Sequence, residues 1–226
     1  MAASIVIGPL LRHVDHGSAA IWVETDAPAR VEVRAGEHTA SASTFSAHGH
    51  HYALVELTGL PSGLDSTYEV LVDDAHAWPK ADDPRPAPRL NTLTPGAAVD
   101  LGVGSCRPSV SHDEKGHRTH GVDALRTLGM ANALGREDAP ALPEMMLLLG
   151  DQVYADATSE AMQEFIASRR SLDEGPGKEL ADYEEYAHLY SLAWGEPWVR
   201  WLLASLPTLM IFDDHDVRDD WNTSAA

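Results

Sequence analysis

The sequence predicts an α/β protein with an all-β first part and a second part in which strands and helices alternate. Up to about residue 93, short β-type runs are separated by turn residues, which is typical of an antiparallel sandwich. From residue 99 on, apolar runs alternate with helical segments, which indicates βαβ units and a mostly parallel sheet. Between them, the proline-rich residues 78–89 resist both helix and central strand. We therefore expect two domains, residues 1–95 and 96–226.

The amino-acid composition limits the classes of molecule that this chain is expected to bind. The chain has 226 residues, 44% of them hydrophobic, and its 16 basic and 35 acidic side chains give a net charge of −19. No Lys/Arg cluster offsets this charge, so we expect neither a nucleic-acid-binding patch nor attachment to an anionic membrane. A single cysteine excludes an intramolecular disulfide. Without a signal-peptide pattern or a membrane-spanning apolar run, the sequence predicts a cytoplasmic protein, or a secreted one if a leader has been removed.

The first domain is predicted to contain strands at residues 19–23, 29–33, 51–57 and 68–72. Leu60-Pro61 followed by Tyr68 resembles the Leu-x-Pro…Tyr stretch of fibronectin type III-like domains. In those domains the tyrosine hydroxyl ties a loop back to its strand. We expect a fibronectin type III-like β-sandwich, with Trp22 and Tyr68 packed in its core.

The second domain is predicted to contain three buried strands and four helices. The strands are residues 99–103, 145–149 and 209–212, and the helices are residues 120–134, 159–170, 182–193 and 196–206. His112, His117 and His120 are expected in a polar loop.

Each of the three apolar runs ends in chemically reactive residues. Cys106 follows the first run, Asp151 the second, and three carboxylates with an imidazole, residues 213–216, follow the third. Catalytic groups in α/β proteins collect beyond the carboxyl ends of strands, so we expect these side chains to form a metal-binding set. Two metal ions could share Asp151, although this residue could instead cap the next helix.

The acidic segment at residues 213–216 is the most specific of these signals. Adjacent charges at the end of a buried strand cost desolvation energy unless they meet a metal or partner charges. Alternation along an extended chain would place Asp214 and Asp216 on one side and Asp213 and His215 on the other, until the strand ends. The segment alone therefore does not identify the ligands. Cys106 could likewise be an inert buried thiol, or a ligand that favours iron or zinc.

Four segments in chain order resemble the catalytic segments of alkaline phosphatase D-type (PhoD-like) metallophosphoesterases. They are residues 104–106 (GSC), 149–154 (LGDQVY), 181–190 (ADYEEYAHLY) and 212–222 (FDDHDVRDDWN). The resemblance implies metal-dependent hydrolysis of small phosphate monoesters or diesters. The preceding sandwich is similar to the N-terminal domain of that family.

The resemblance also implies roles for individual residues. Cys106 and Tyr154 would bind iron(III), Asp151 would bridge it to calcium, and Asp214 would bind the second metal. His215 would stabilise the transition state or protonate the leaving oxygen. Residues such as Asp213, Arg218, Asp219, Trp221 and Asn222 would at most surround the site.

The sequence departs from the family pattern at its C-terminal end. The later histidine-bearing and acidic motifs of the family have no counterpart before Ala226. We therefore expect an incomplete metallophosphatase-type domain whose exposed sheet edge favours self-association. Whether this chain turns substrate over by itself is a separate question.

Three other readings remain open. The chain could be a catalytically silent fragment whose sandwich binds a partner. The acidic cluster at residues 213–220 could form a structural calcium site. Cys106 could be the nucleophile of a thiol hydrolase, although that mechanism needs a paired base that the sequence does not identify.

Overall fold

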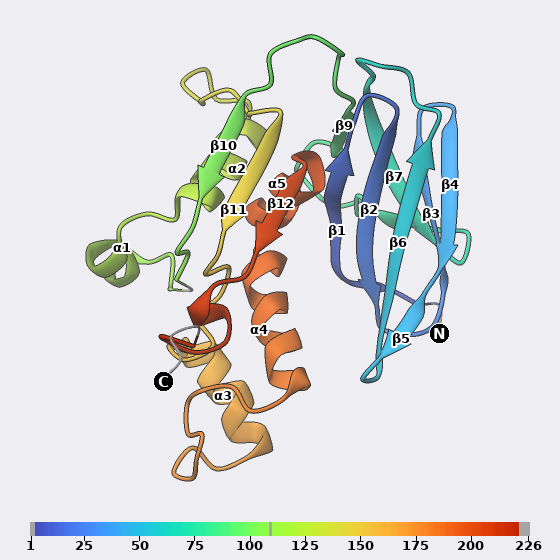
Figure 1. Cartoon of the computed structure of the whole chain (residues 1–226). Coiled ribbons are helices and arrows are strands. Elements are labelled where there is room, and N and C mark those ends of the chain that lie inside the picture. Colours follow the sequence, from blue (N-terminus) through green and yellow to red (C-terminus); the bar gives the residue numbers. More distant parts are fainter. Residues whose placement is uncertain (1–2, 109, 222–226) are drawn as a thin grey trace. The chain divides into compact units, whose positions relative to one another are not determined.

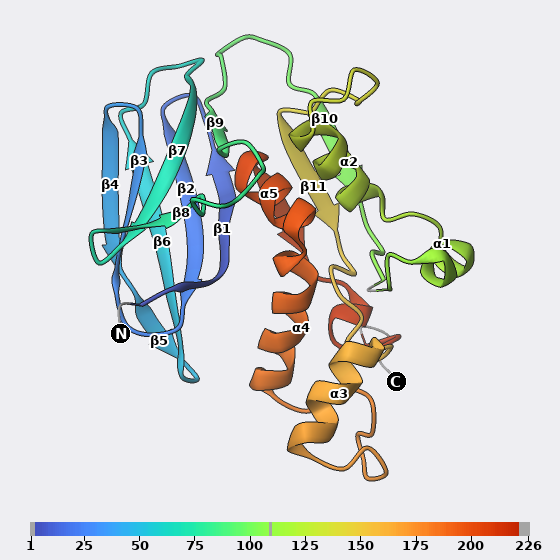
Figure 2. The same ribbon diagram turned by 180° about the vertical axis from the view of Figure 1, so that it is seen from behind.

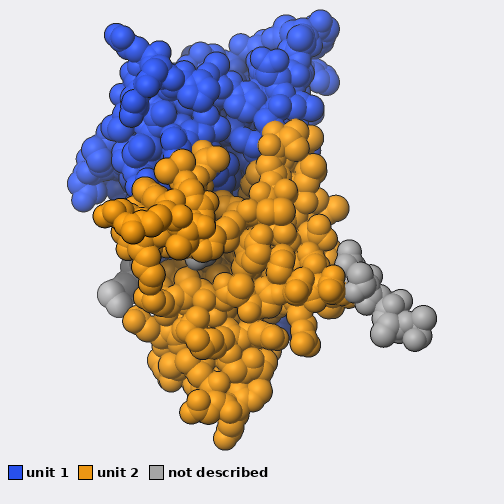
Figure 3. All heavy atoms as spheres, turned by 90° about the vertical axis from the view of Figure 1, so that its left-hand side faces the viewer, with its two compact units in different colours: residues 1–102, 125–146, 194–209 blue, residues 103–124, 147–193, 210–226 orange. Residues whose placement is uncertain are grey.

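A computed structural model describes residues 3–108 and 110–221 of the chain. The chain forms two compact units (Figure 3). The first unit comprises residues 1–102, 125–146 and 194–209, and the second comprises residues 103–124, 147–193 and 210–226. None of the described helices is long and apolar enough to cross a membrane.

The N-terminal part of the first unit is a β-sandwich, as predicted (Figure 1). One sheet has the order β1-β2-β6-β5, with β1 at Ile5–Val14, β2 at Ser18–Thr25, β5 at Phe45–Ala47 and β6 at His50–Thr58. The other has the order β4-β3-β7-β8, and β9 also pairs with β7. Its strands are β3 at Arg30–Ala35, β4 at His38–Ser43, β7 at Asp65–Val72, β8 at Ala75–Trp78 and β9 at Arg89–Asn91.

The sandwich core follows from the alternation of side chains along the strands. In the antiparallel pair β2–β6, Ile21 lies opposite Val55, and both side chains are fully buried. Val33 and Val70, opposite each other in β3 and β7, are equally buried from the second sheet. Because successive side chains point to opposite faces of a strand, this register places one apolar row of each sheet in a common core.

Helix α5 (Pro197–Ser205) packs against β1 and belongs to the first unit (Figures 1 and 2). Pro197 suits the first helical position because that position needs no backbone donor. The preceding Glu196 carboxylate accepts hydrogen bonds from the Trp198 and Val199 amides, which fixes the start of the helix. The Tyr68 hydroxyl donates to the Ala204 carbonyl of α5 at 2.7 Å. This tyrosine, which is buried as expected, therefore contacts a helix and not the neighbouring sandwich loop that its motif suggested.

The C-terminal half contains a three-stranded sheet in the order β10-β11-β12. The strands are β10 at Leu101–Gly104, β11 at Met145–Leu149 and β12 at Thr208–Ile211, and their arrows point the same way in Figure 1. The helices α1 (Glu114–His120) and α2 (Ala124–Ala133) lie between β10 and β11 in sequence. The helices α3 (Glu160–Arg169), α4 (Tyr183–Gly195) and α5 lie between β11 and β12. The predicted strand–helix alternation is confirmed.

The structure corrects the sequence prediction between β10 and β11. The helix predicted at residues 120–134 is α2, which begins only at Ala124, and His120 instead ends the separate helix α1, where Gly121 adopts a left-handed φ of 77°. The polar loop expected around the three histidines is wrong for His117 and His120, which lie in α1. Asp113 caps this short helix by accepting a hydrogen bond from the Gly116 amide at 2.8 Å.

Candidate metal centre

Three loops that follow β10, β11 and β12 meet within the second unit. The Cys106 amide donates to the Gly150 carbonyl at 3.3 Å, and the Arg107 amide donates to the Asp151 carbonyl at 3.0 Å. A Cβ atom on Gly150 would lie 2.4 Å from the Asp213 Cβ, so only glycine permits the third loop to approach this closely. The sequence prediction that these three strand ends converge is thus correct for their backbones.

Asp151 is the central carboxylate of the site. Its side chain is buried, with 6% of the residue exposed, and its Oδ1 has no hydrogen-bond partner among the described residues. Ligand atoms of Asp151, Asp214 and His215 all lie within 4.8 Å of one another. The alternative role of Asp151 as a helix cap is wrong, because the next helix, α3, is capped by Ser159.

Tyr154 lies beside both the thiol and the imidazole of the site. Its ring stacks on the His215 ring with centroids 4.5 Å apart. Burial, followed by the negative charges of Asp151 and Cys106, raises the pKa of Tyr154 to about 12. Cys106 is exposed, so its interpretation as an inert buried thiol is wrong. The phenol therefore lies beside the thiol and close enough to Asp151 to respond to its charge.

His215 is oriented by Asp156, a residue that the sequence analysis did not single out. The His215 Nδ1 lies 2.9 Å from the Asp156 Oδ2, and this oxygen also accepts from the Asp219 amide at 2.6 Å. Burial alone would lower the pKa of His215, but the hydrogen bond to Asp156 and the nearby carboxylates raise it above its usual value. The position of Asp156 two residues after Tyr154 was the only sequence signal for this partner.

The acidic segment after β12 forms a single turn of 3-10 helix, η1 (Asp214–Asp216), so the alternation of an extended strand does not apply to it. Asp214 lies near Asp151, whereas Asp216 is buried and accepts from the Val153 amide. A hydrogen bond from the Asp220 amide lowers the pKa of Asp214. Carboxylate oxygens of Asp214, Asp219 and Asp220 also lie within 4.8 Å of one another, in a more exposed group.

The donor set fits a bound cation. A buried carboxylate oxygen without a hydrogen-bond donor is costly unless a positive charge faces it. Around it are a carboxylate oxygen and an imidazole nitrogen, and the Tyr154 phenol, which is hydrogen-bonded to the softer Cys106 thiol, is near enough to respond to the Asp151 charge. Among the described residues, no Lys or Arg forms an ion pair with Asp151, and the nearby His215 is already paired with Asp156, so a metal ion would satisfy the remaining oxygen.

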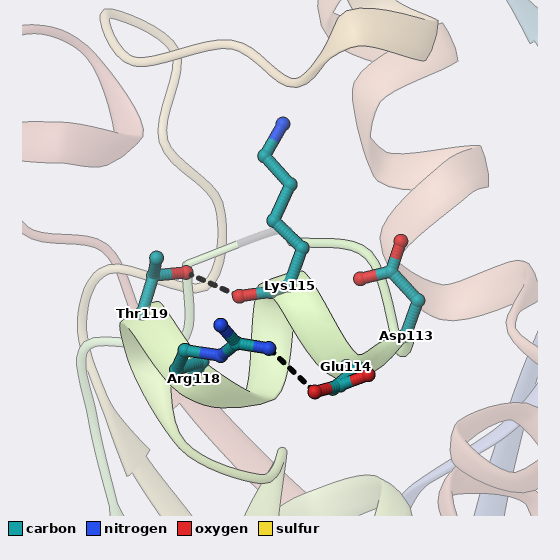
Figure 4. A pocket seen from close by; sticks show the side chains of 5 residues that line it. All are labelled: Asp113, Glu114, Lys115, Arg118 and Thr119. Carbon is teal, nitrogen blue, oxygen red and sulfur yellow. Dashed lines mark hydrogen bonds and ion pairs between the residues drawn. The ribbon is translucent and has the colours of Figure 1, made fainter.

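A separate surface pocket of about 370 Å³ lies along α1 and contains none of the predicted site residues (Figure 4). It is lined by Asp113, Glu114, Lys115, Arg118 and Thr119. The Thr119 hydroxyl donates to the Lys115 carbonyl, and Arg118 pairs with Glu114 (Figure 4). Most of these groups already have partners within the helix, and the Lys115 ammonium pairs with Glu160 of α3, so the pocket adds nothing to the metal centre.

Two family models and a solved structure are similar to parts or most of this chain. Residues 127–226 match the PhoD-like phosphatase family, and residues 2–90 match a domain of unknown function, DUF7800. A solved structure described as "Structure of PhoD" is similar to 97% of this chain, with a TM-score of 0.59 and 16% sequence identity. This chain covers 40% of the length of that one. No curated protein gives a significant match.

A carbohydrate acetylesterase from Xanthomonas citri is also similar over 91% of this chain and 60% of its own. Its TM-score of 0.28 and sequence identity of 8% are too low to indicate a shared fold or function. The family match and the PhoD structure together confirm the predicted resemblance to PhoD-like phosphatases and the α/β fold. At 16% identity, the structural match concerns the fold alone.

Proposed function

We propose that this chain carries part of the active site of a metal-dependent phosphoesterase acting on small phosphate monoesters or diesters. The observation that carries the proposal is the buried Asp151, whose partnerless oxygen lies within 4.8 Å of ligand atoms on Asp214 and His215. The PhoD-like match over residues 127–226 supports the reaction class. We assign Cys106, Asp151, Tyr154 and Asp214 as metal ligands, and Asp151 and His215 as catalytic residues.

The donors on the two sides of Asp151 differ in chemistry. The thiol of Cys106 and the phenol of Tyr154 suit iron(III), whereas the carboxylates around Asp214 suit calcium. Asp151 would then bridge the two ions. When bound, such ions would neutralise phosphate charge and lower the pKa of an attacking water.

His215 would supply the proton for the leaving oxygen. Its Nδ1 is held by the Asp156 carboxylate, and its Nε2 lies 3.9 Å from the exposed Asp219 carboxylate, which leaves Nε2 as the edge that a substrate would approach. The raised pKa of His215 favours the protonated ring, which is the form that a general acid needs. Asp156 thereby sets both the orientation and the charge of the ring.

The first test measures metal binding, which does not depend on the rest of a longer PhoD-like chain. The purified protein is loaded with iron(III) and calcium, and its metal content and visible absorption are recorded. We expect a phenolate-to-iron absorption band that disappears in Tyr154→Phe and bound metal that is lost in Asp151→Asn. The exposed Asp82 provides a matched control, because Asp82→Asn removes the same charge elsewhere.

Activity is then measured with p-nitrophenyl phosphate and bis(p-nitrophenyl) phosphate. We expect any hydrolysis to require Asp151 and His215 and to survive Asp82→Asn. A protein that binds neither ion and shows no Asp151-dependent hydrolysis would contradict the proposal.

A structural calcium site is the second candidate function, favoured by the close approach of Asp214, Asp219 and Asp220. In that case calcium alone would raise the melting temperature, and Cys106→Ala would respond to calcium as the wild type does. Loss of metal binding in Cys106→Ala would instead support the mixed iron and calcium centre.

A further inference from the structure

Asp216 is a buried carboxylate that takes no part in the proposed chemistry. Only 4% of the residue is exposed. Its Oδ1 accepts from the Val153 amide at 3.1 Å and from the Tyr190 hydroxyl at 3.2 Å, and its Oδ2 accepts from the Asp213 amide at 3.0 Å. One side chain therefore connects the loop after β11, the loop after β12 and helix α4.

Two tyrosines of α4 donate hydrogen bonds to the segment that contains Asp216. Tyr190 reaches Asp216, and four residues earlier the Tyr186 hydroxyl donates to the Val217 carbonyl at 3.2 Å. Residues four apart lie on the same face of a helix, so both hydroxyls reach the same segment. The segment at residues 181–190 is one of the four that carry the resemblance to PhoD-like enzymes, yet it supplies none of the assigned ligands.

We propose that Asp216, together with Tyr190, is a positioning residue that sets the separation between the two halves of the metal centre. Val153, which donates to Asp216, lies between Asp151 and Tyr154 in sequence. Asp214 and His215 lie in the same turn as Asp216. A backbone hydrogen bond from the Ala155 amide to the His215 carbonyl, 2.9 Å long, joins the same two loops. The expected effect on metal binding rests on the proposed function, but the attachment of the two loops by Asp216 can be tested in the metal-free protein.

A carboxylate is the group that this position requires. All three of its partners are donors, and an ionised carboxylate offers only acceptors. In Asp216→Asn, the amide group would direct an N–H either at the Asp213 amide or at the Val153 amide and the Tyr190 hydroxyl. One of the two loops would then lose its attachment, while the size of the side chain stays the same.

The experiment compares Asp216→Asn with Tyr190→Phe and uses Asp173→Asn, an exposed position of the same unit, as the matched control. Hydrogen exchange of the Val153 and Asp213 amides is measured in the metal-free protein, and Mn²⁺ serves as the probe for cation affinity. We expect at least one of these amides to exchange at least about tenfold faster in Asp216→Asn. Mn²⁺ affinity should fall by about 10- to 100-fold, the usual effect of removing a group that orients metal ligands. Asp173→Asn should match the wild type in both readouts.

Unchanged exchange and unchanged Mn²⁺ affinity in Asp216→Asn would overturn the inference. If Asp216→Asn does not fold, Tyr190→Phe tests the inference in its place. We expect smaller changes in the same direction in amide exchange and in Mn²⁺ affinity. If neither quantity changes in Tyr190→Phe, the inference is overturned. If the wild type binds none of Mn²⁺, iron(III) and calcium, the proposed function fails, and the exchange of the two amides still decides whether Asp216 holds the loops together.

Discussion

At the scale of single residues, the candidate centre holds several unfavourable features at once. Cys106 and Asp151 both adopt left-handed backbone conformations, with φ angles of 56° and 50°. Such angles are strained for residues other than glycine. Asp151 is in addition buried beside other acidic groups, with one oxygen lacking a donor. Binding sites commonly sacrifice folding stability in this way.

Asp151→Asn should therefore stabilise the metal-free protein. The substitution removes a buried negative charge, and asparagine tolerates a left-handed backbone conformation well. We expect the free energy of unfolding to rise by about 0.5–2 kcal/mol without metal and the stabilisation by added cations to disappear. Thermal melts with and without Mn²⁺ measure both effects. A less stable metal-free variant that still gains stability from Mn²⁺ would show that Asp151 has a structural role only.

At the scale of elements, α5 is attached to the sandwich by specific polar contacts. Besides the Tyr68 hydroxyl, the Trp201 indole nitrogen donates to the Pro86 carbonyl at 2.8 Å, and the Arg200 guanidinium lies 4.2 Å from the centre of the Trp78 ring. Helix α5, which lies within the residues that match the PhoD-like phosphatase family, thus folds as part of the first unit. It leads directly into β12 and the acidic turn.

Tyr68→Phe tests this attachment. The variant leaves the Ala204 carbonyl of α5 without its buried donor, which should cost about 1–2 kcal/mol of unfolding free energy. Chemical denaturation measures the loss. Tyr183→Phe, at a tyrosine that is exposed, should change stability much less. Equal effects of the two substitutions would mean that the Tyr68 hydroxyl does not stabilise the contact with α5.

The start of α4 predicts a response to acid. Arg169 donates two hydrogen bonds to Asp182, and together with the Glu185 amide this lowers the pKa of Asp182 to about 2 from an ordinary value of 3.8. The folded protein therefore binds this proton less readily than the unfolded chain. The associated stability is present above about pH 4 and is lost as the pH falls to about 2. Asp182→Asn should be less stable at pH 7 and should lose less stability over that pH interval, as measured by urea denaturation at each pH.

The strands and helices that sequence predicts well are those with strong apolar patterns. The run at residues 145–149 is β11 itself, and the helices predicted at residues 159–170 and 196–206 are α3 and α5 within a residue at each end. Helix α1 has no apolar periodicity, so its seven residues, six of them polar, are typical of a loop. No individual strand is predicted before residue 19, although β1 covers Ile5–Val14. Irregular pairing around its Gly8-Pro9 segment weakens the alternation there.

The residues of the candidate site likewise fall into those that the sequence predicts and those that it does not. The residues at strand ends could be predicted, because a parallel sheet brings its carboxyl ends together. Asp156 and Asp216 could not be assigned roles, because the His215 ring beside Asp156 and the Val153 amide bound to Asp216 lie about 60 residues away in sequence. Such contacts depend on how two loops fold against each other, and periodicity contains no information on this.

At the scale of the whole molecule, strong negative charge coexists with exposed apolar side chains. The net charge is −19 at pH 7 and the isoelectric point is about 4.8. Near the carboxyl ends of three adjacent strands, Val103, Leu149 and Ile211 are 63%, 52% and 59% exposed. Exposed apolar groups on neighbouring strands favour association, whereas the net charge opposes it.

We predict that self-association at pH 7 increases with salt and increases further as the pH approaches 4.8, because both changes weaken repulsion between copies. Sedimentation velocity over a series of salt and pH values measures this response. The double variant Val103→Thr/Ile211→Thr keeps β-branched side chains but adds hydroxyls, so it should associate less. Leu54→Thr alters an exposed apolar residue of the sandwich and should associate as the wild type does. The opposite ranking of these variants would place the contact on the sandwich and leave the β10-β11-β12 strands without a part in it.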